Sequence, residues 1–204
     1  ILKYTDKIEV YLELGPDIGL VAKRLSSEIK RAKAMLVEPN LAVHEKLAKN
    51  TSHFQDVLIV QHLRDVSLNL EEKPDLIVGI HVLDHLPEPA LTLQNLHQLS
   101  SKNAKLCLVV HNERSILRML LRKKWPPFCL QHPQLFEPNT IKNILESNGW
   151  NPISIRRTRN YYSLQNILRM GFSVLKIPTF FIRLIPNLVI PIYLGNMMVV
   201  AEKN

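Results

Sequence analysis

The sequence predicts an α/β fold with a seven-stranded, mostly parallel sheet and helices on both faces. Two observations predict it. Strand-like and helix-like segments alternate along the chain, which is the pattern of a parallel sheet covered by helices. A hydrophobic content of 46% over 204 residues is also sufficient for one large core. We therefore expect a single domain over residues 1–204.

The expected strands are short apolar runs. They cover residues 8–14, 34–38, 57–61, 75–80, 104–110, 152–158 and 192–201. Helical spacing of apolar side chains predicts helices over 19–32 and 89–102, which should pack on the sheet. A further helix should begin near Pro138 and end before Gly149, because proline favours the first turn of a helix and glycine favours the position after its last turn.

A segment rich in Leu, Ile, Phe and Pro, about residues 163–191, separates the last two expected strands. Charges and prolines interrupt it too often for a transmembrane helix. We expect core packing or a helical lid, and alternatively a basic amphipathic segment that touches a membrane and suits a lipid-linked acceptor. The sequence begins with Ile1 and a strand follows within ten residues, so we expect an N-terminal helical cap to be absent.

The net charge of +8 favours anionic partners in general, because a positive field concentrates negative ligands and surfaces. The basic clusters are expected to be mainly solvated faces. No zinc-finger, RRM-like or Gly-x-x-Gly pattern accompanies them, which disfavours nucleic acid as a partner. Two cysteines without a C-x-x-C pair, and no signal-peptide pattern, predict a cytoplasmic protein. The sequence indicates no particular oligomeric state.

The first expected strand runs into a glycine-containing turn, VYLELGPDIG, at residues 10–19. Gly15 and Gly19 lie between this strand and the following helix, as a nucleotide-type site requires. The second strand ends at Glu38, an acid placed to accept hydrogen bonds from the two hydroxyls of an adenosine ribose. Together these features favour adenosine-type binding over a purely structural turn.

Two carboxylates, Glu13 and Asp17, accompany this turn. In NAD and FAD sites the same loop faces a pyrophosphate, which a carboxylate would repel. S-adenosylmethionine carries a sulfonium and an ammonium and no phosphate, so acids near its methionine end are tolerated or favourable. The sequence therefore predicts a nucleoside ligand that carries positive charge.

Five stretches carry a family resemblance: LELGPDIG, VEPN, PDLIVGIHVLDHLPEP, LCLVVHNE and HPQLFEPNTIKNILESNGW. They resemble the class I S-adenosylmethionine-dependent methyltransferases, in the small-molecule branch that includes ubiquinone-biosynthesis O-methyltransferases. The resemblance extends from about residue 8 to residue 201 and implies a Rossmann-like, doubly wound sheet with an antiparallel last strand. It also implies in-line methyl transfer from S-adenosylmethionine to a small or lipid-linked metabolite, with O-methylation favoured and S-adenosylhomocysteine as the product.

The same resemblance implies a cofactor site by position. Its residues would be Glu13, Gly15, Asp17, Gly19, Glu38, Asp65, His81 and Val82. Glu38 would hold the ribose and Asp65 would contact the adenine. His81 and Val82, where the fourth strand ends, would lie beside the methionine end and the substrate. Asp17 stands where the family has glycine, so either the turn adapts to a Cβ or cofactor binding is weakened.

Three histidines are candidates for a catalytic base: His81, His85 and His111. An imidazole titrates near neutral pH, and ligands of open α/β sheets bind at the edge where these strands end. Some related O-methyltransferases hold a divalent metal with an acid-x-x-acid-His pattern, and here His81, Asp84 and His85 form His-x-x-Asp-His. We favour a site without metal, in which Asp84 and His85 start the next helix.

Two other functions stay open at this point. The altered loop at Asp17 and the missing cap would also suit a Rossmann-like binding module without catalysis. The positive charge would suit an RNA methyltransferase, although no Asn-Pro-Pro-Tyr-type motif for clamping a base is present.

Overall fold

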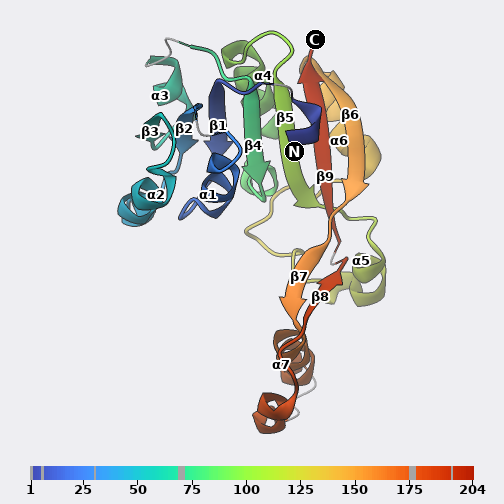
Figure 1. Cartoon of the computed structure of the whole chain (residues 1–204). Coiled ribbons are helices and arrows are strands. Elements are labelled where there is room, and N and C mark those ends of the chain that lie inside the picture. The colour runs from blue at the N-terminus through green and yellow to red at the C-terminus, as the bar shows by residue number, and fades with distance from the viewer. Residues whose placement is uncertain (1, 6, 30, 69–71, 175–177, 194) are drawn as a thin grey trace.

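The computed structural model describes residues 2–5, 7–29, 31–68, 72–174, 178–193 and 195–204. Its centre is a seven-stranded sheet with the strand order β3-β2-β1-β4-β5-β9-β6 (Figure 1). The strands are β1 (Val10–Leu14), β2 (Lys33–Val37), β3 (Asp56–Val60), β4 (Leu76–Ile80), β5 (Lys105–His111), β6 (Trp150–Arg157) and β9 (Asn196–Lys203). Neighbours pair in parallel except at β9, which is antiparallel to β5 and β6. The predicted fold class is confirmed.

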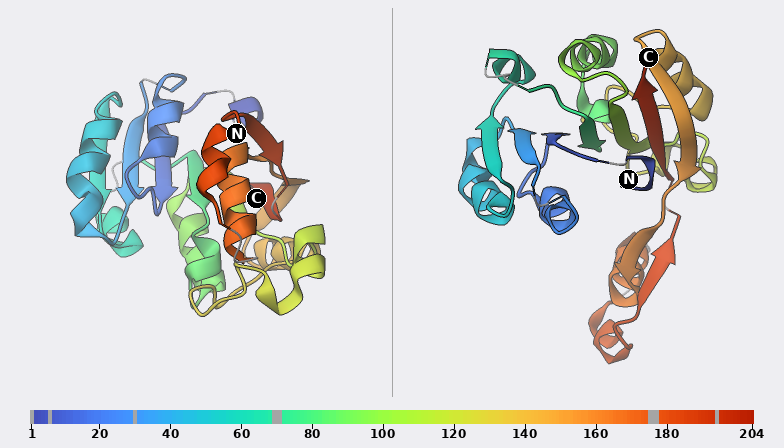
Figure 2. Two further views of the ribbon diagram at one scale, coloured as in Figure 1. Left: turned by 90° about the horizontal axis from the view of Figure 1, so that it is seen from below. Right: turned by 45° about the horizontal axis from the view of Figure 1, so that its top comes forward.

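Helices cover both faces of this sheet (Figure 2). One face carries α1 (Leu20–Ser26) and α2 (His44–Thr51), and the other carries α3 (Leu63–Leu68), α4 (Pro89–Leu99) and α6 (Pro138–Glu146). The apolar side chains of each set join those of the strands in a separate buried cluster. Because the sheet is covered on both sides, β1 is buried at all five positions, as expected for a central parallel strand.

The remaining elements are η1 (Leu2–Tyr4), η2 (Leu41–Val43), η3 (Leu83–His85), α5 (Ile116–Leu121), η4 (Arg122–Lys124), β7 (Asn160–Ser163), α7 (Leu164–Val174), η5 (Phe180–Leu184) and β8 (Val189–Ile192). Most of them are short, but α7 is as long as α4. The helix predicted over 19–32 is shorter than expected. It ends at Ser26 because the hydroxyls of Ser26 and Ser27 donate to backbone carbonyls one turn earlier.

The connection between β6 and β9 forms an arm, residues 158–195, that projects beyond the sheet (Figures 1 and 2). Its base is the antiparallel ribbon of β7 and β8, and its far end holds α7 and η5. None of its described side chains between 163 and 191 belongs to either core cluster, although Ile182 in η5 is fully buried, so the packing found there is separate from the core of the sheet. Residues 175–177 of this predicted insertion lie outside the described residues.

The last strand of the main sheet begins at Asn196, later than expected from the apolar pattern. Gly195 adopts a φ of 91°, which interrupts the extended conformation between the arm and β9. In the described part of the chain, no helix is long and apolar enough to cross a lipid bilayer.

Candidate active site

The loop between β1 and α1 contains three residues in the left-handed region: Gly15 (φ 58°), Asp17 (φ 50°) and Gly19 (φ 77°). A Cβ on Gly15 would lie 2.6 Å from Val82 Cγ2, and one on Gly19 would lie 2.6 Å from Leu47 Cδ1. Both glycines are therefore required by space as well as by conformation. Asp17 adopts the conformation that a glycine would supply, since aspartate tolerates this region better than most residues. The turn adapts to its side chain.

Glu38 directly follows β2 and holds this loop. Its Oε2 accepts a hydrogen bond from the backbone N–H of Asp17 at 2.9 Å, and its Oε1 accepts one from the N–H of Asn40 at 2.9 Å. Each carboxylate oxygen can accept a second hydrogen bond, so two acceptor positions remain. This arrangement fits the two hydroxyls of a ribose.

Glu13 is buried against α1. Its Oε2 accepts a hydrogen bond from the Tyr11 hydroxyl at 2.7 Å, and its carboxylate also accepts from the backbone N–H of Ala22. Burial raises the pKa of Glu13 to about 7, although the two hydrogen bonds lower it. Glu13 is therefore only partly ionised at neutral pH, and Asp17 is the exposed acid of the loop.

Asp65 lies in the first turn of α3, which follows β3. Its Oδ2 accepts a hydrogen bond from the backbone N–H of His62 at 3.2 Å, and its Oδ1 is 3.8 Å from Arg64 Nε. Because β1, β2 and β3 are adjacent and parallel, Asp65 lies at the same edge of the sheet as Gly15 and Glu38.

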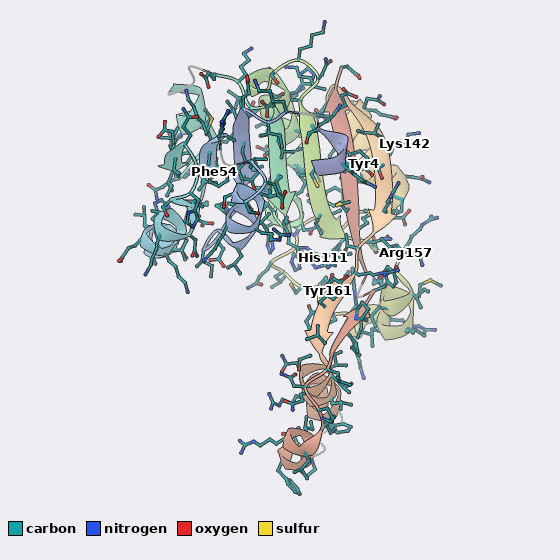
Figure 3. The ribbon with its side chains drawn as sticks, viewed as in Figure 1. Tyr4, Phe54, His111, Lys142, Arg157 and Tyr161 are labelled. Carbon is teal, nitrogen blue, oxygen red and sulfur yellow. The ribbon has the colours of Figure 1, made fainter. Side chains whose placement is uncertain are left out.

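Four histidine rings form a row at the carboxyl ends of β4 and β5. The ring centroids are 4.5 Å apart for His81 and His111, 4.8 Å for His111 and His132, and 4.4 Å for His132 and His85. Figure 3 shows His111 at the end of β5, where the arm leaves the sheet. The structure thus brings the three predicted histidines together and places His132 in the same row.

Asp84 is completely buried and contacts two of these rings. Its Oδ2 accepts a hydrogen bond from His111 Nδ1 at 2.9 Å and lies 3.6 Å from His81 Nδ1. Burial raises the pKa of Asp84, but the hydrogen bond from His111 and the nearby imidazole of His81 outweigh burial and lower the pKa below its ordinary value. An ionised Asp84 therefore fixes the tautomer of His111 with the proton on Nδ1, which leaves the lone pair on Nε2. Among the described residues, His111 Nε2 has no hydrogen-bond partner.

His81 follows β4 with a φ of 53°, a conformation that non-glycine residues rarely adopt. Its backbone N–H donates to the carbonyl of Val109 at 2.8 Å, and its Nε2 accepts from the side-chain amide of Asn196 at 3.3 Å. Such strain costs about 1–3 kcal/mol and is concentrated at functional sites. The contacts of His81 with Asp84, Val109 and Asn196 hold the ring over the end of the sheet.

His85 and His132 form the outer end of the row. His85 Nδ1 is 2.8 Å from the carbonyl oxygen of Gln131, and His132 Nδ1 is 2.8 Å from that of Pro127. Burial lowers the pKa of His132, and the charges of His111 and His85 lower it further, against the opposing effect of the Pro127 carbonyl. His132 is consequently biased towards its neutral form.

A hollow of about 590 Å³ opens beside His132. It is lined by Glu113, Phe128, Cys129, Leu130, His132, Pro133, Gln134 and Leu135. The exposed Cys129 has its Sγ 3.2 Å from His132 Nδ1. The other cysteine, Cys107, is buried in β5, and burial raises the pKa of its thiol to about 11.

The metal pattern of His81, Asp84 and His85 is not formed. His85 is turned towards the Gln131 carbonyl. Among the residues that the structure describes, it is His81, Asp84 and His111 whose ligand atoms lie within 4.8 Å of one another. The Nδ1 of His111 is used in its hydrogen bond to Asp84. The geometry of this donor set therefore fits an oriented imidazole better than a metal centre.

The strand order, the antiparallel β9, the glycine loop after β1 and the acid after β2 define the fold of a class I S-adenosylmethionine-dependent methyltransferase. A family model described as a methyltransferase domain matches residues 1–155. The chain belongs to this methyltransferase family and is a transferase enzyme.

Solved structures share this fold at low identity, which shows the fold alone. An S-adenosylmethionine-dependent methyltransferase from Archaeoglobus fulgidus is 16% identical, with 99% of this chain and 89% of that chain covered and a TM-score of 0.62. Magnesium protoporphyrin IX methyltransferase from Synechocystis, with bound S-adenosylhomocysteine, is 14% identical, with 97% and 75% covered and a TM-score of 0.57. A Bradyrhizobium japonicum N-methyltransferase in complex with S-adenosylhomocysteine is 12% identical, with 97% and 79% covered and a TM-score of 0.59.

A search of the curated proteins finds no match to the chain. The resemblance to the ubiquinone-biosynthesis branch is not tested by these comparisons and stays a prediction.

Proposed function

We propose that this methyltransferase transfers the methyl group of S-adenosylmethionine to a hydroxyl oxygen of a small or lipid-linked metabolite. The observation that carries the proposal is the pair of Asp84 and His111, whose carboxylate and imidazole are 2.9 Å apart at the carboxyl edge of the sheet. A hydroxyl acceptor must lose a proton as it is methylated, and an imidazole oriented by a carboxylate is suited to accept it.

The first half of the proposed site binds the cofactor. Glu38 would accept hydrogen bonds from the ribose hydroxyls, and Asp65 would lie on the adenine side. The loop from Gly15 to Gly19, together with His81 and Val82, would bind the methionine end, with the carboxylate of Asp17 facing its positive charge. When bound, S-adenosylmethionine supplies a methyl group made electrophilic by the sulfonium.

The second half of the proposed site binds the acceptor. His111 Nε2 would take the hydroxyl proton while Asp84 stabilises the resulting imidazolium. His81, His85 and His132 would line the approach, and the hollow beside His132 would hold the body of the acceptor through Phe128 and Leu130. Much of the rate would come from holding the oxygen in line with the methyl group.

The test has two stages. Calorimetry with S-adenosylmethionine and S-adenosylhomocysteine measures cofactor binding, and a panel of hydroxyl, amine and carbon acceptors then measures transfer of labelled methyl. We expect turnover with a hydroxyl acceptor, and we expect H111Q to lower kcat at least about 100-fold with cofactor affinity unchanged. The control is H53Q, which replaces an exposed histidine beyond α2. Turnover confined to amines, or an H111Q variant with full activity, would contradict the proposal.

A further inference from the structure

The net positive charge of the chain comes from two segments. Residues 114–136 and 147–201 together contain eleven of the 26 basic residues and none of the 18 acidic ones. The rest of the chain has 15 basic and 18 acidic side chains, so it is net negative although the whole chain carries +8. The first segment contains α5 and η4 and is called the α5 segment below. The second contains β6 and the arm.

The α5 segment has its apolar side chains on the outside. Ile116, Met119 and Leu120 are spaced to share one face of α5, and they are 62%, 69% and 73% exposed. A surface helix of a globular protein normally turns such a face to the core. The next three residues, Arg122, Lys123 and Lys124, are exposed, and none forms an ion pair within the described part of the chain. An apolar face followed by free cations is typical of a segment that lies in the interface of a bilayer.

The arm repeats this combination. Leu184 is 87% exposed in η5, and Leu188 and Val189 are exposed where the chain returns along β8. Arg169 and Arg183 lie among these apolar side chains and are also exposed. The arm thus presents apolar and basic groups together, with no acid to neutralise them.

The two segments are fixed to each other at Gly195. The carbonyl of Gly195 accepts a hydrogen bond from the N–H of Asn112 at 2.7 Å, and a Cβ on Gly195 would lie 2.5 Å from the Ser115 hydroxyl that caps α5. Figure 1 shows α5 beside the base of the arm. The arm leaves the sheet at the end of β6, which runs parallel to β5, so both segments lie at the edge that carries His111.

We infer that the α5 segment and the arm form one docking surface for an anionic phospholipid bilayer, with α5 and the end of the arm inserted at the headgroup level. A second copy of the chain that docks through the same surface fits less well, because it would place arginines and lysines against each other. RNA would satisfy the cations but would leave the apolar side chains in water. Lipid phosphates and acyl chains satisfy both kinds of group.

This surface goes beyond the proposed function and does not depend on it, since docking needs neither cofactor nor acceptor. Its position has a consequence for the site, however. The hollow beside His132 is lined mainly by residues of the α5 segment, so docking brings the hollow near the lipid surface.

Vesicle flotation with the full chain tests the inference without any methyl-transfer reagent. We expect binding to vesicles of phosphatidylcholine mixed with phosphatidylserine and little binding to phosphatidylcholine alone. R122Q/K123Q/K124Q should lower the partition coefficient about 100-fold, at about fivefold for each cation removed. K46Q/K49Q/K102Q removes equal charge from exposed sites outside the surface and should change binding less than about threefold. Equal binding to both vesicle types, or equal losses in both variants, would overturn the inference.

A second pair of variants tests the contribution of the apolar side chains to vesicle binding. M119S/L120S should weaken binding about tenfold, whereas L41S/L91S, which alters two exposed leucines elsewhere, should leave it unchanged. An L184W variant should shift its fluorescence to the blue on charged vesicles and be quenched by brominated lipid. Circular dichroism checks that each variant is folded. If polyuridylate binds and displaces the vesicles, the partner is RNA and not a bilayer. If the chain binds no vesicles but self-associates, and the same substitutions abolish this self-association, the partner is a second copy of the chain.

Discussion

The two halves of the sheet's carboxyl edge are built in different ways. At β1 and β2 the geometry depends on backbone conformation, with glycines at positive φ and one carboxylate, Glu38, that accepts from backbone N–H groups. At β4 and β5 it depends on side chains, with Asp84 binding two imidazoles and Asn196 contacting one of them from β9. The first half is held by backbone hydrogen bonds and by steric contacts at the glycines. The second is assembled from distant segments and depends on hydrogen bonds and protonation.

The largest effect should be on kcat and should follow from substituting Asp84, at the centre of the half built at β4 and β5. D84N keeps the size of the buried side chain but removes the charge that orients His111 and stabilises its protonated form. We expect kcat to fall at least about 100-fold while calorimetry finds S-adenosylmethionine affinity within about threefold of the native value. A matching loss of cofactor affinity would mean that the two halves are not separable.

Substitutions in the half built at β1 and β2 should lower the free energy of unfolding and weaken cofactor binding. G15A introduces a Cβ that meets Val82 and forces alanine to a φ of 58°, which should destabilise the protein by about 3 kcal/mol in urea unfolding. V82A in the same chain removes the contact but not the strained conformation, so it should restore only part of the loss. A double-mutant cycle of the two substitutions measures the contact directly. Purely additive effects would show that Val82 does not restrict this position.

Because of Glu13, the free energy of unfolding should fall as pH rises. Its pKa is raised in the folded protein from 4.5 to about 7, so between these values the unfolded chain loses its proton while the folded chain keeps it. The added stability is therefore complete below pH 4.5 and is lost as pH rises to about 7, a change of about 3 kcal/mol. Denaturant titrations across this range should give a flatter profile for E13Q than for the native chain. Parallel profiles for the two proteins would show that Glu13 is not the titrating group.

The smallest effect should come from Asp17, and it tests the charge argument alone. D17N keeps the backbone N–H that donates to Glu38 but removes an exposed negative charge from the loop. S-adenosylmethionine affinity should fall about threefold, and S-adenosylhomocysteine affinity should change less because it lacks the sulfonium. D17G, with the conformation preserved, should stay within about 0.5 kcal/mol of native stability. Equal changes for the two ligands would remove Asp17 from cofactor recognition.

The same contrast explains what could be predicted from the sequence. The alternation of strands and helices, the glycine loop and the place of Glu38 after the second strand follow from patterns of neighbouring segments, and local spacing predicts them well. The orienting contact of Asp84 with His111 spans 27 residues and requires that β4 and β5 be neighbours. Sequence spacing alone suggests that His81, Asp84 and His85 form one set of metal ligands. Spacing does not show that His85 Nδ1 contacts the Gln131 carbonyl.

Two features leave no local signal in the sequence. Asn196 reaches His81 across 115 residues, and nothing near either residue indicates that contact. The ribbon of β7 and β8 is equally hidden, because its residues resemble extensions of the flanking strands. The absence of acids from residues 147–201 is different, since it is visible in the amino-acid composition and marks the segment that contains the arm.

Cys129 gives the molecule a built-in reporter position. It is exposed at the hollow beside His132, whereas the only other thiol, Cys107, is buried and holds its proton more tightly. A maleimide dye would therefore label the native chain at one place without any engineering. Its emission would follow the filling of that hollow in real time, whatever molecule enters it.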